Sequence, residues 1–238
     1  MPKNQLDLPP VFHKFLIALM LLAAASVAGQ SMPPAAAPPV EKLGENLFRI
    51  GQLRVDRAAR EVVATGVLND ITTVEFVAST TDGVKGYESA IALDTNAISL
   101  NAALLLIGLD PARSKAAKVQ FDSTPPEGDP VDLFVELPAA GKPRRVRVED
   151  ILFDQGTKKT LKPGPWVYSG STFIETDSGR RFMAEVDGIL IGLMRGPSAL
   201  IDNPRSDVLG RFGAIILNPA VAKPGMKVSL IVRALPRP

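Results

Sequence analysis

The sequence predicts an α+β fold that is mostly β: an antiparallel or mixed sheet, or a partly closed barrel, packed around one buried apolar helix. Three observations predict this class. Short β-branched runs bounded by Gly, Pro and Asp recur from about residue 42 to the C-terminus. Several runs alternate apolar and polar side chains, most clearly over residues 131–137, so one face of each strand meets a core. One segment, residues 96–108, is too long and too rich in Ala and Leu for a strand.

Residues 1–28 are predicted to be a signal peptide. A polar start with Lys3 and Lys14 precedes an apolar run over residues 15–25, and small residues follow at 26–28. This layout is typical of a secretory signal, and the apolar run is shorter than the about 20 residues that span a bilayer. We expect export to the periplasm or the extracellular medium, with no transmembrane span after cleavage. Because the chain has no Cys, it lacks a lipobox and is not expected to be a lipoprotein.

Residues 29–41 are predicted to be a linker. Four prolines stand within residues 31–41, a composition that favours an extended, semi-rigid spacer. The remaining residues, 42–238, are expected to form a single domain. A split into two domains near residue 125 is the alternative.

The strands are expected at the β-branched runs, with tight turns at Asp-Gly pairs such as Asp187-Gly188. The runs cover residues 47–55, 61–68, 73–78, 118–121, 131–137, 144–148, 172–175, 181–185, 189–194, 214–217 and 227–234.

The helix over residues 96–108 begins at Asn96, a favourable N-cap, and ends at Gly108. After the cap, polar side chains occur only at Ser99 and Asn101, so nearly the whole circumference is apolar. Such a helix is expected to be buried on all sides. A second, shorter helix is expected over residues 148–153.

The composition excludes many kinds of chemistry. The one His is His13, inside the predicted signal, so the mature chain would have neither His nor Cys. This excludes thiol nucleophiles, iron–sulfur clusters, His-ligated haem, Cys/His zinc sites and triads with a His base. We expect no cofactor and no metal site. The basic run over residues 142–147 has no interleaved aromatics, so it is interpreted as a solvated strand face and no nucleic acid partner is expected.

The pair Glu88-Ser89, after a Gly-rich turn, is the first candidate for catalysis. A carboxylate beside a hydroxyl can bind a ligand or a cation, but such a pair more commonly caps backbone groups or forms an ion pair. Carboxylates are the only strong general acid/base groups left, and a glycosidase needs two of them about 5–10 Å apart. The candidates are Glu88, Asp94, Asp177, Glu185, Asp187, Asp202 and Asp207.

Trp166 and Tyr168 are the candidate ligand-binding aromatics, together with the nearby Ser171. Because they lie two residues apart on a strand, their rings are expected on one face, where they would form a stacking platform for a sugar or peptide. The alternative is that Trp166 is a core residue and Tyr168 its neighbour.

Four segments in a fixed order carry a resemblance to a known family. They are Tyr-Glu-Ser at residues 87–89, the apolar run 102–109 with Pro111 after it, Trp-Val-Tyr-Ser-Gly-Ser at 166–171 and Asp-Gly-Ile-Leu-Ile at 187–191. In this combination the chain resembles the YdjY-domain family of exported bacterial proteins over most of residues 45–235.

The resemblance implies a family without an established activity and without accepted catalytic residues. Relatives described as ferredoxin-like have Cys-rich segments, so that description cannot apply to a chain without Cys. Family members often place His before the Glu-Ser pair. This chain has Tyr87 there, so a metal or proton role of that His would not carry over.

The sequence has no phosphate-cradling Gly-Lys-Ser/Thr loop, no Gly-x-Gly-x-x-Gly and no Gly-x-Ser-x-Gly motif. We therefore expect an exported, non-enzymatic binding or accessory protein of the cell envelope, with an envelope protein or a glycan as its partner. One alternative is a carboxylate-dependent hydrolase or cation-assisted enzyme that acts on envelope material, with Glu88 as the first residue to test. The other is a protein–protein interaction module.

Overall fold

The structure is a computed structural model that describes residues 39–177 and 179–237. The predicted signal peptide and most of the predicted linker lie outside these residues. Eight of the described strands form a closed ring, because β4 pairs with β6 at the end of the strand order. In ring order they are β4 (Glu61–Leu68), β17 (Lys227–Ala234), β7 (Asp129–Leu137), β11 (Trp166–Tyr168), β15 (Ile201–Asp202), β14 (Ile189–Gly192), β5 (Phe76–Thr80) and β6 (Ser89–Leu93).

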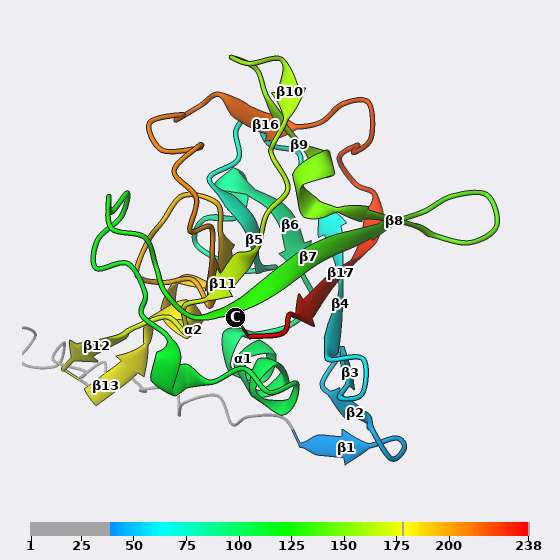
Figure 1. Cartoon of the computed structure of the whole chain (residues 1–238), viewed down its shortest axis with the longest axis vertical. Coiled ribbons are helices and arrows are strands. Elements are labelled where there is room, and N and C mark those ends of the chain that lie inside the picture. Colours follow the sequence, from blue (N-terminus) through cyan, green and yellow to red (C-terminus); the bar gives the residue numbers. More distant parts are fainter. Residues whose placement is uncertain (1–38, 178, 238) are drawn as a thin grey trace, which may run out of the picture. The chain divides into compact units, whose positions relative to one another are not determined.

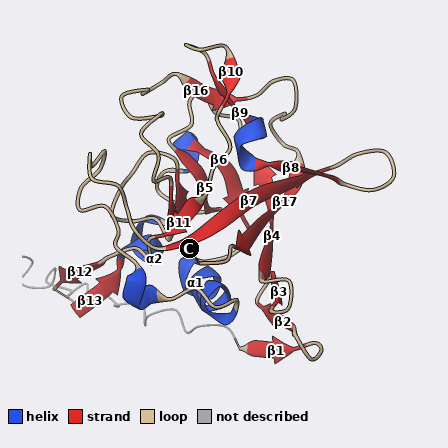
Figure 2. Cartoon of the chain, in the orientation of Figure 1, coloured by secondary structure: helices blue, strands red, loops and turns tan. Residues whose placement is uncertain are grey.

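The barrel is mixed. The pairs β14–β15 and β5–β6 are parallel, and the other neighbours in the ring are antiparallel. With few helices around it, this confirms the predicted α+β, mostly β class (Figure 2).

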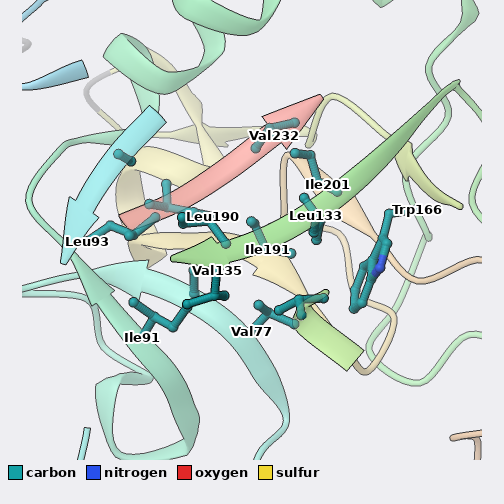
Figure 3. Packing of buried hydrophobic residues seen from close by; sticks show 14 of the residues in the cluster. Val77, Ile91, Leu93, Leu133, Val135, Trp166, Leu190, Ile191, Ile201 and Val232 are labelled. Carbon is teal, nitrogen blue, oxygen red and sulfur yellow. The ribbon is translucent and has the colours of Figure 1, made fainter. Parts of the chain in front are cut away.

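The barrel interior is the main hydrophobic core. Strand β7 alternates strictly, so Val131, Leu133, Val135 and Leu137 all point inward. Figure 3 shows side chains of β7, β14, β5 and β6 meeting there, with Trp166 at one side. The strand β17 pairs with β4 on one side and β7 on the other, which places the C-terminal strand in the middle of the sheet.

Smaller sheets and an extension surround the barrel (Figure 1). The strands β1 (Val40–Lys42), β2 (Leu47–Ile50) and β3 (Leu53–Asp56) continue the sheet from β4, and β8 (Arg144–Arg147) pairs with β7. The other strands are β9 (Leu152–Asp154), β10 (Lys159–Thr160) and β16 (Ile215–Leu217) in one sheet, and the hairpin of β12 (Phe173–Thr176) and β13 (Gly179–Phe182).

The predicted helix is present as α1 (Ala97–Leu106), but its burial on all sides was wrong. Ala97, Leu100 and Leu104 are buried, whereas Leu105 is 40% exposed. The helix packs against β3 and β14 and leaves one side open to solvent. Its N-terminus is capped twice. Asn96 Oδ1 accepts a hydrogen bond from the Ser99 backbone N–H, as expected. The backbone N–H groups of Ala97 and Ile98 donate to the Glu185 side chain.

Local predictions differ from the structure in several places. Residues 118–121 form turns and no strand, and residues 47–55 split into β2 and β3. The segment 181–185 leaves β13 and enters the short helix α2 (Met183–Asp187). The expected helix over 148–153 is the 3-10 helix η3 (Val148–Ile151) followed by β9. Strand β1 begins at Val40, so it includes the last two residues of the predicted linker.

Two further 3-10 helices complete the described elements: η1 (Gly86–Glu88) and η2 (Pro111–Arg113). In the described part of the chain, no helix is long and apolar enough to cross a membrane.

Candidate functional site

A cavity of about 360 Å³ opens beside the barrel, between β5, β14, α2 and the two loops that contain residues 84–85 and 196–199. Its wall is mainly apolar. Phe76, Ile189 and Ala199 form a hydrophobic cluster that is separate from the main core. Phe76 and Ile189 make the floor of the cavity because β5 and β14 are neighbours whose side chains here point outward from the barrel, and Ala199 joins them from the 196–199 loop. The remaining apolar wall is formed by Val84, Met183, Met194 and Pro197.

The end of α2 gives the cavity its carboxylate, Asp187. The helix stops at Gly188, whose φ of +68° places it in the left-handed region. A Cβ at Gly188 would also lie 2.5 Å from the Gly83 Cα, so only glycine allows this close approach. The expected hairpin turn at Asp187-Gly188 is therefore a helix C-terminus. It brings the residue 81–86 loop close, and the Val84 N–H donates to the Asp187 carbonyl oxygen.

Asp187 has a partner within the cavity wall. Ser198 Oγ donates a short hydrogen bond to Asp187 Oδ2. Ser171, one of the predicted binding residues, holds this wall from behind. Its Oγ donates to the Ser198 carbonyl oxygen over 2.7 Å and accepts from the Ala184 N–H of α2 over 3.1 Å. Ser171 thus connects the 196–199 loop to α2 without lining the cavity.

Lys85 is the cationic residue of the cavity wall. Its Nζ donates to Tyr87 Oη over 2.9 Å and to Glu88 Oε2 over 3.1 Å. The hydrogen bonds to Tyr87 and Glu88 raise the pKa of the Lys85 ammonium. Ser89 is buried and its Oγ donates to the Lys85 carbonyl oxygen.

The predicted pair Glu88-Ser89 therefore lies behind Lys85 and orients it. Neither residue lines the cavity. A second carboxylate is close to Glu88: burial, and then the charge of Glu88, raise the pKa of Glu75.

Trp166 and Tyr168 do not form a surface platform. Both side chains are almost fully buried, and Trp166 Nε1 donates to Glu149 Oε1 over 3.0 Å. Tyr168 Oη donates to Asn101 Oδ1 of α1, and burial raises the pKa of Tyr168 to about 12. The stacking interpretation is wrong, because a ring with no exposed face cannot stack on a ligand. The core interpretation describes both residues.

Asp202 lies beneath the 196–199 wall. Its Oδ2 accepts from Ser169 Oγ over 2.6 Å, and the same hydroxyl lies 3.3 Å from the Ala199 carbonyl oxygen. Burial raises the pKa of the Asp202 carboxyl to about 7, against the lowering effects of Ser169 and Arg195. A Cβ at Gly192, its partner on β14, would lie 2.5 Å from Asp202 Oδ1, so glycine makes room for the carboxylate.

Arg195 is a buried cation on the same side of the barrel. Its guanidinium donates to backbone carbonyl oxygens of residues 122–123 and 203–205. It thereby ties two loops to the segment that leads into the cavity wall. The guanidinium also interacts with the charge of Asp202. Arg195 and Asp202 therefore form a buried polar layer beneath the cavity wall.

One comparison with known proteins gives a result. The family model of the YdjY domain matches residues 53–212. The chain belongs to the YdjY domain family. No curated protein and no solved structure gives a significant match. The YdjY match includes every element that lines the cavity but ends before β17, the strand that joins β4 to β7.

The other carboxylates predicted as candidates, Asp94, Asp177, Glu185 and Asp207, do not line the cavity. Glu185 Oε2 accepts from the Ala97 and Ile98 N–H groups and so supplies the second cap of α1. Asp94 lines a different groove, along β4 and β17, and Asp207 lies 4.0 Å from Arg205. Asp177 is at the turn of the β12–β13 hairpin. Over residues 39–177 and 179–237, no cluster of three or more acidic or His side chains could hold a metal ion.

Sequence reasoning missed Lys85 and Ser198 as site residues. Lys85 looked like part of a turn, and Ser198 follows Gly196-Pro197, a loop signal without a chemical motif. Their importance depends on the packing of the 81–86 and 196–199 loops against α2, which no local pattern encodes.

Proposed function

We propose that this YdjY-domain protein is an exported, non-enzymatic binding or accessory protein of the cell envelope that takes the apolar part of a ligand into the cavity. The signal-like N-terminal segment supports export. The cavity supports binding, because ligand sites are concave, mainly apolar and equipped with a few polar groups that fix orientation.

The observation that carries the non-enzymatic part is the pairing of the two charged groups in the wall. Asp187 is held by Ser198, and Lys85 by Glu88 and Tyr87. Among the described residues that line the cavity, Asp187 is the one carboxylate. A hydrolase that used two carboxylates across its cleft would need a second one there.

Binding is tested with N-phenyl-1-naphthylamine, a neutral dye that brightens in apolar sites, added to the purified protein. We expect saturable binding that falls at least tenfold in Ala199→Phe, which fills the floor, and in Val84→Asp, which places a charge at the rim. Val84 is 60% exposed, so the second variant leaves the core intact. The matched control is Val40→Asp, at a valine that is 53% exposed and is not among the lining residues. Absence of saturable binding would contradict the proposal.

Export is tested by producing the chain with its own N-terminal segment in a bacterial host. We expect the protein in the periplasm or the medium, with an intact mass that begins at Gly29. Retention of the complete chain in the cytoplasm would contradict the proposed location.

One observation favours the hydrolase as a second candidate function. Glu75 and Glu88 lie close together beside Lys85, and the pKa of Glu75 is raised. This is the pattern of an acid/base pair. It predicts turnover of a glycan, peptide or ester that is lost in both Glu75→Gln and Glu88→Gln. Such turnover would replace the non-enzymatic proposal.

A further inference from the structure

The cavity wall has few aromatic rings. Phe76 is its one aromatic ring among the described residues, whereas two thioether side chains, Met183 and Met194, face the same space. Sugar rings and aromatic ligands are usually held by aromatic faces. Methionine side chains adapt to flexible aliphatic groups because they are unbranched and polarizable. The lining therefore fits a flexible aliphatic chain better than a ring.

The size of the cavity limits the chain. A volume of about 360 Å³ equals the space of about a dozen water molecules at roughly 30 Å³ each. A methylene group has a similar volume, so the cavity accommodates a chain of about ten to twelve carbons.

Lys85 has one hydrogen-bond donor to spare. A lysine ammonium has three N–H donors, and the described acceptors of Lys85 Nζ are Tyr87 Oη and Glu88 Oε2. The third N–H remains for a ligand. Because Ser89 holds the Lys85 backbone and Glu88 holds its ammonium, this donor is fixed before a ligand arrives.

We propose that the cavity takes an acyl group: an aliphatic chain of about ten to twelve carbons whose carboxyl or ester oxygen accepts a hydrogen bond from Lys85. This inference rests on the proposed function and specifies its ligand. A free fatty acid and an esterified acyl chain share this chemistry. An alkyl amine has no acceptor for the Lys85 N–H, and its ammonium would have to compete with Ser198 for Asp187, the one carboxylate among the described lining residues.

The test is displacement of N-phenyl-1-naphthylamine from the purified protein by decanoate, methyl decanoate and decylamine, each below its micelle concentration. We expect the two acyl compounds to compete at least tenfold more strongly than decylamine. The stronger of the two identifies a free acid or an ester as the source. From octanoate to dodecanoate, affinity should rise by up to about fourfold for each added methylene, and it should level off once the cavity is full.

Lys85→Met tests the head group, because it keeps an apolar stem of similar length. The dye is titrated again in this variant, and each competitor is compared with the others within it. We expect the preference for methyl decanoate over decylamine to fall to within about twofold. Lys142→Met, at an exposed lysine outside the cavity, is the charge-matched control and should keep the preference.

Three results separate this inference from the proposed function. If the dye binds but no acyl compound displaces it, the acyl proposal is overturned and the binding function stands. Equal weakening of all three competitors by Lys85→Met would overturn the role of Lys85 at the head group. If the dye itself does not bind the unmodified protein, both proposals fail.

Discussion

Ser169 donates its hydroxyl proton to Asp202 across 2.6 Å, and both side chains are shut off from solvent beneath the cavity wall. The hydroxyl also lies 3.3 Å from the Ala199 carbonyl oxygen, in the floor of the cavity. A protonated Asp202 could donate to Ser169 Oγ, which would release the serine proton toward Ala199. The hydroxyl of Ser169 thus links the protonation state of Asp202 to the Ala199 backbone in the cavity floor.

The first prediction concerns the pH dependence of stability. The folded-state pKa of Asp202, about 7, lies above its ordinary value of 3.8. Between these values the folded protein holds a proton that the unfolded chain has lost, so the free energy of unfolding falls as pH rises from about 4 to 7. The slope from this group alone is about 1.4 kcal/mol per pH unit. Above pH 7 its contribution is flat.

Asp202→Asn removes this titration and keeps the acceptor for Ser169. Urea unfolding at pH 5, 6, 7 and 8 should show a flatter pH dependence in the variant than in the unmodified protein. Comparing slopes avoids the separate cost of burying an amide. Parallel curves for the two proteins would contradict a raised pKa at Asp202.

The second prediction concerns the space beside Asp202. Gly192→Ala places a Cβ 2.5 Å from Asp202 Oδ1, so it should destabilise the fold by about 1–3 kcal/mol through overpacking. In an Asp202→Ala background the same change should cost clearly less, because the clashing oxygen is gone. A double-mutant cycle by urea unfolding measures this coupling, and additive effects would show that the two positions are independent.

The third prediction concerns the second cap of α1. Glu185→Ala removes the carboxylate that accepts from the first two helical N–H groups. We expect a loss of about 1 kcal/mol, typical of a removed N-cap, because the partner carboxylate also favours the positive end of the helix. Glu175→Ala, at an exposed position on β12, is the matched control and should be nearly neutral. Thermal unfolding measures the stability of both variants, and an equal loss in the two would contradict a capping role for Glu185.

The fourth prediction concerns Trp166, the single tryptophan of the chain. Because its ring is buried and its N–H is bonded to Glu149, fluorescence should be blue-shifted and resistant to iodide quenching. Ligands that displace the dye from the cavity should leave this emission unchanged. Strong quenching by a sugar or peptide would instead return the stacking platform to consideration.

Local sequence pattern was enough for the fold class and for many elements. The strict alternation of residues 131–137 becomes β7, and the Asn96 cap starts α1 as expected. These features depend on neighbours within a few residues, so periodicity and capping chemistry reveal them. The pattern failed at residues 118–121, where an alternating polar and apolar run forms turns and Phe121 has a φ of +62°.

The site was less predictable. Glu88 and Ser89 hold Lys85, and Ser171 holds the 196–199 loop, but none of the three lines the cavity. Trp166 and Tyr168 have the spacing of a platform, but spacing cannot tell which face of a strand is covered. That depends on the neighbours of β11 in the ring, β7 and β15, which come from distant parts of the chain.

By itself, the sequence determined the β-rich class, the position of the one long helix and the absence of thiol groups, because each depends on residue type and local order. The tertiary structure alone decided that β4 and β6 close a ring, that Leu105 stays exposed and that Lys85, Asp187 and Ser198 line one cavity. The physical reason is that strand pairing and loop packing join residues far apart in the chain. Their energies depend on complementary surfaces that exist only once the barrel has closed.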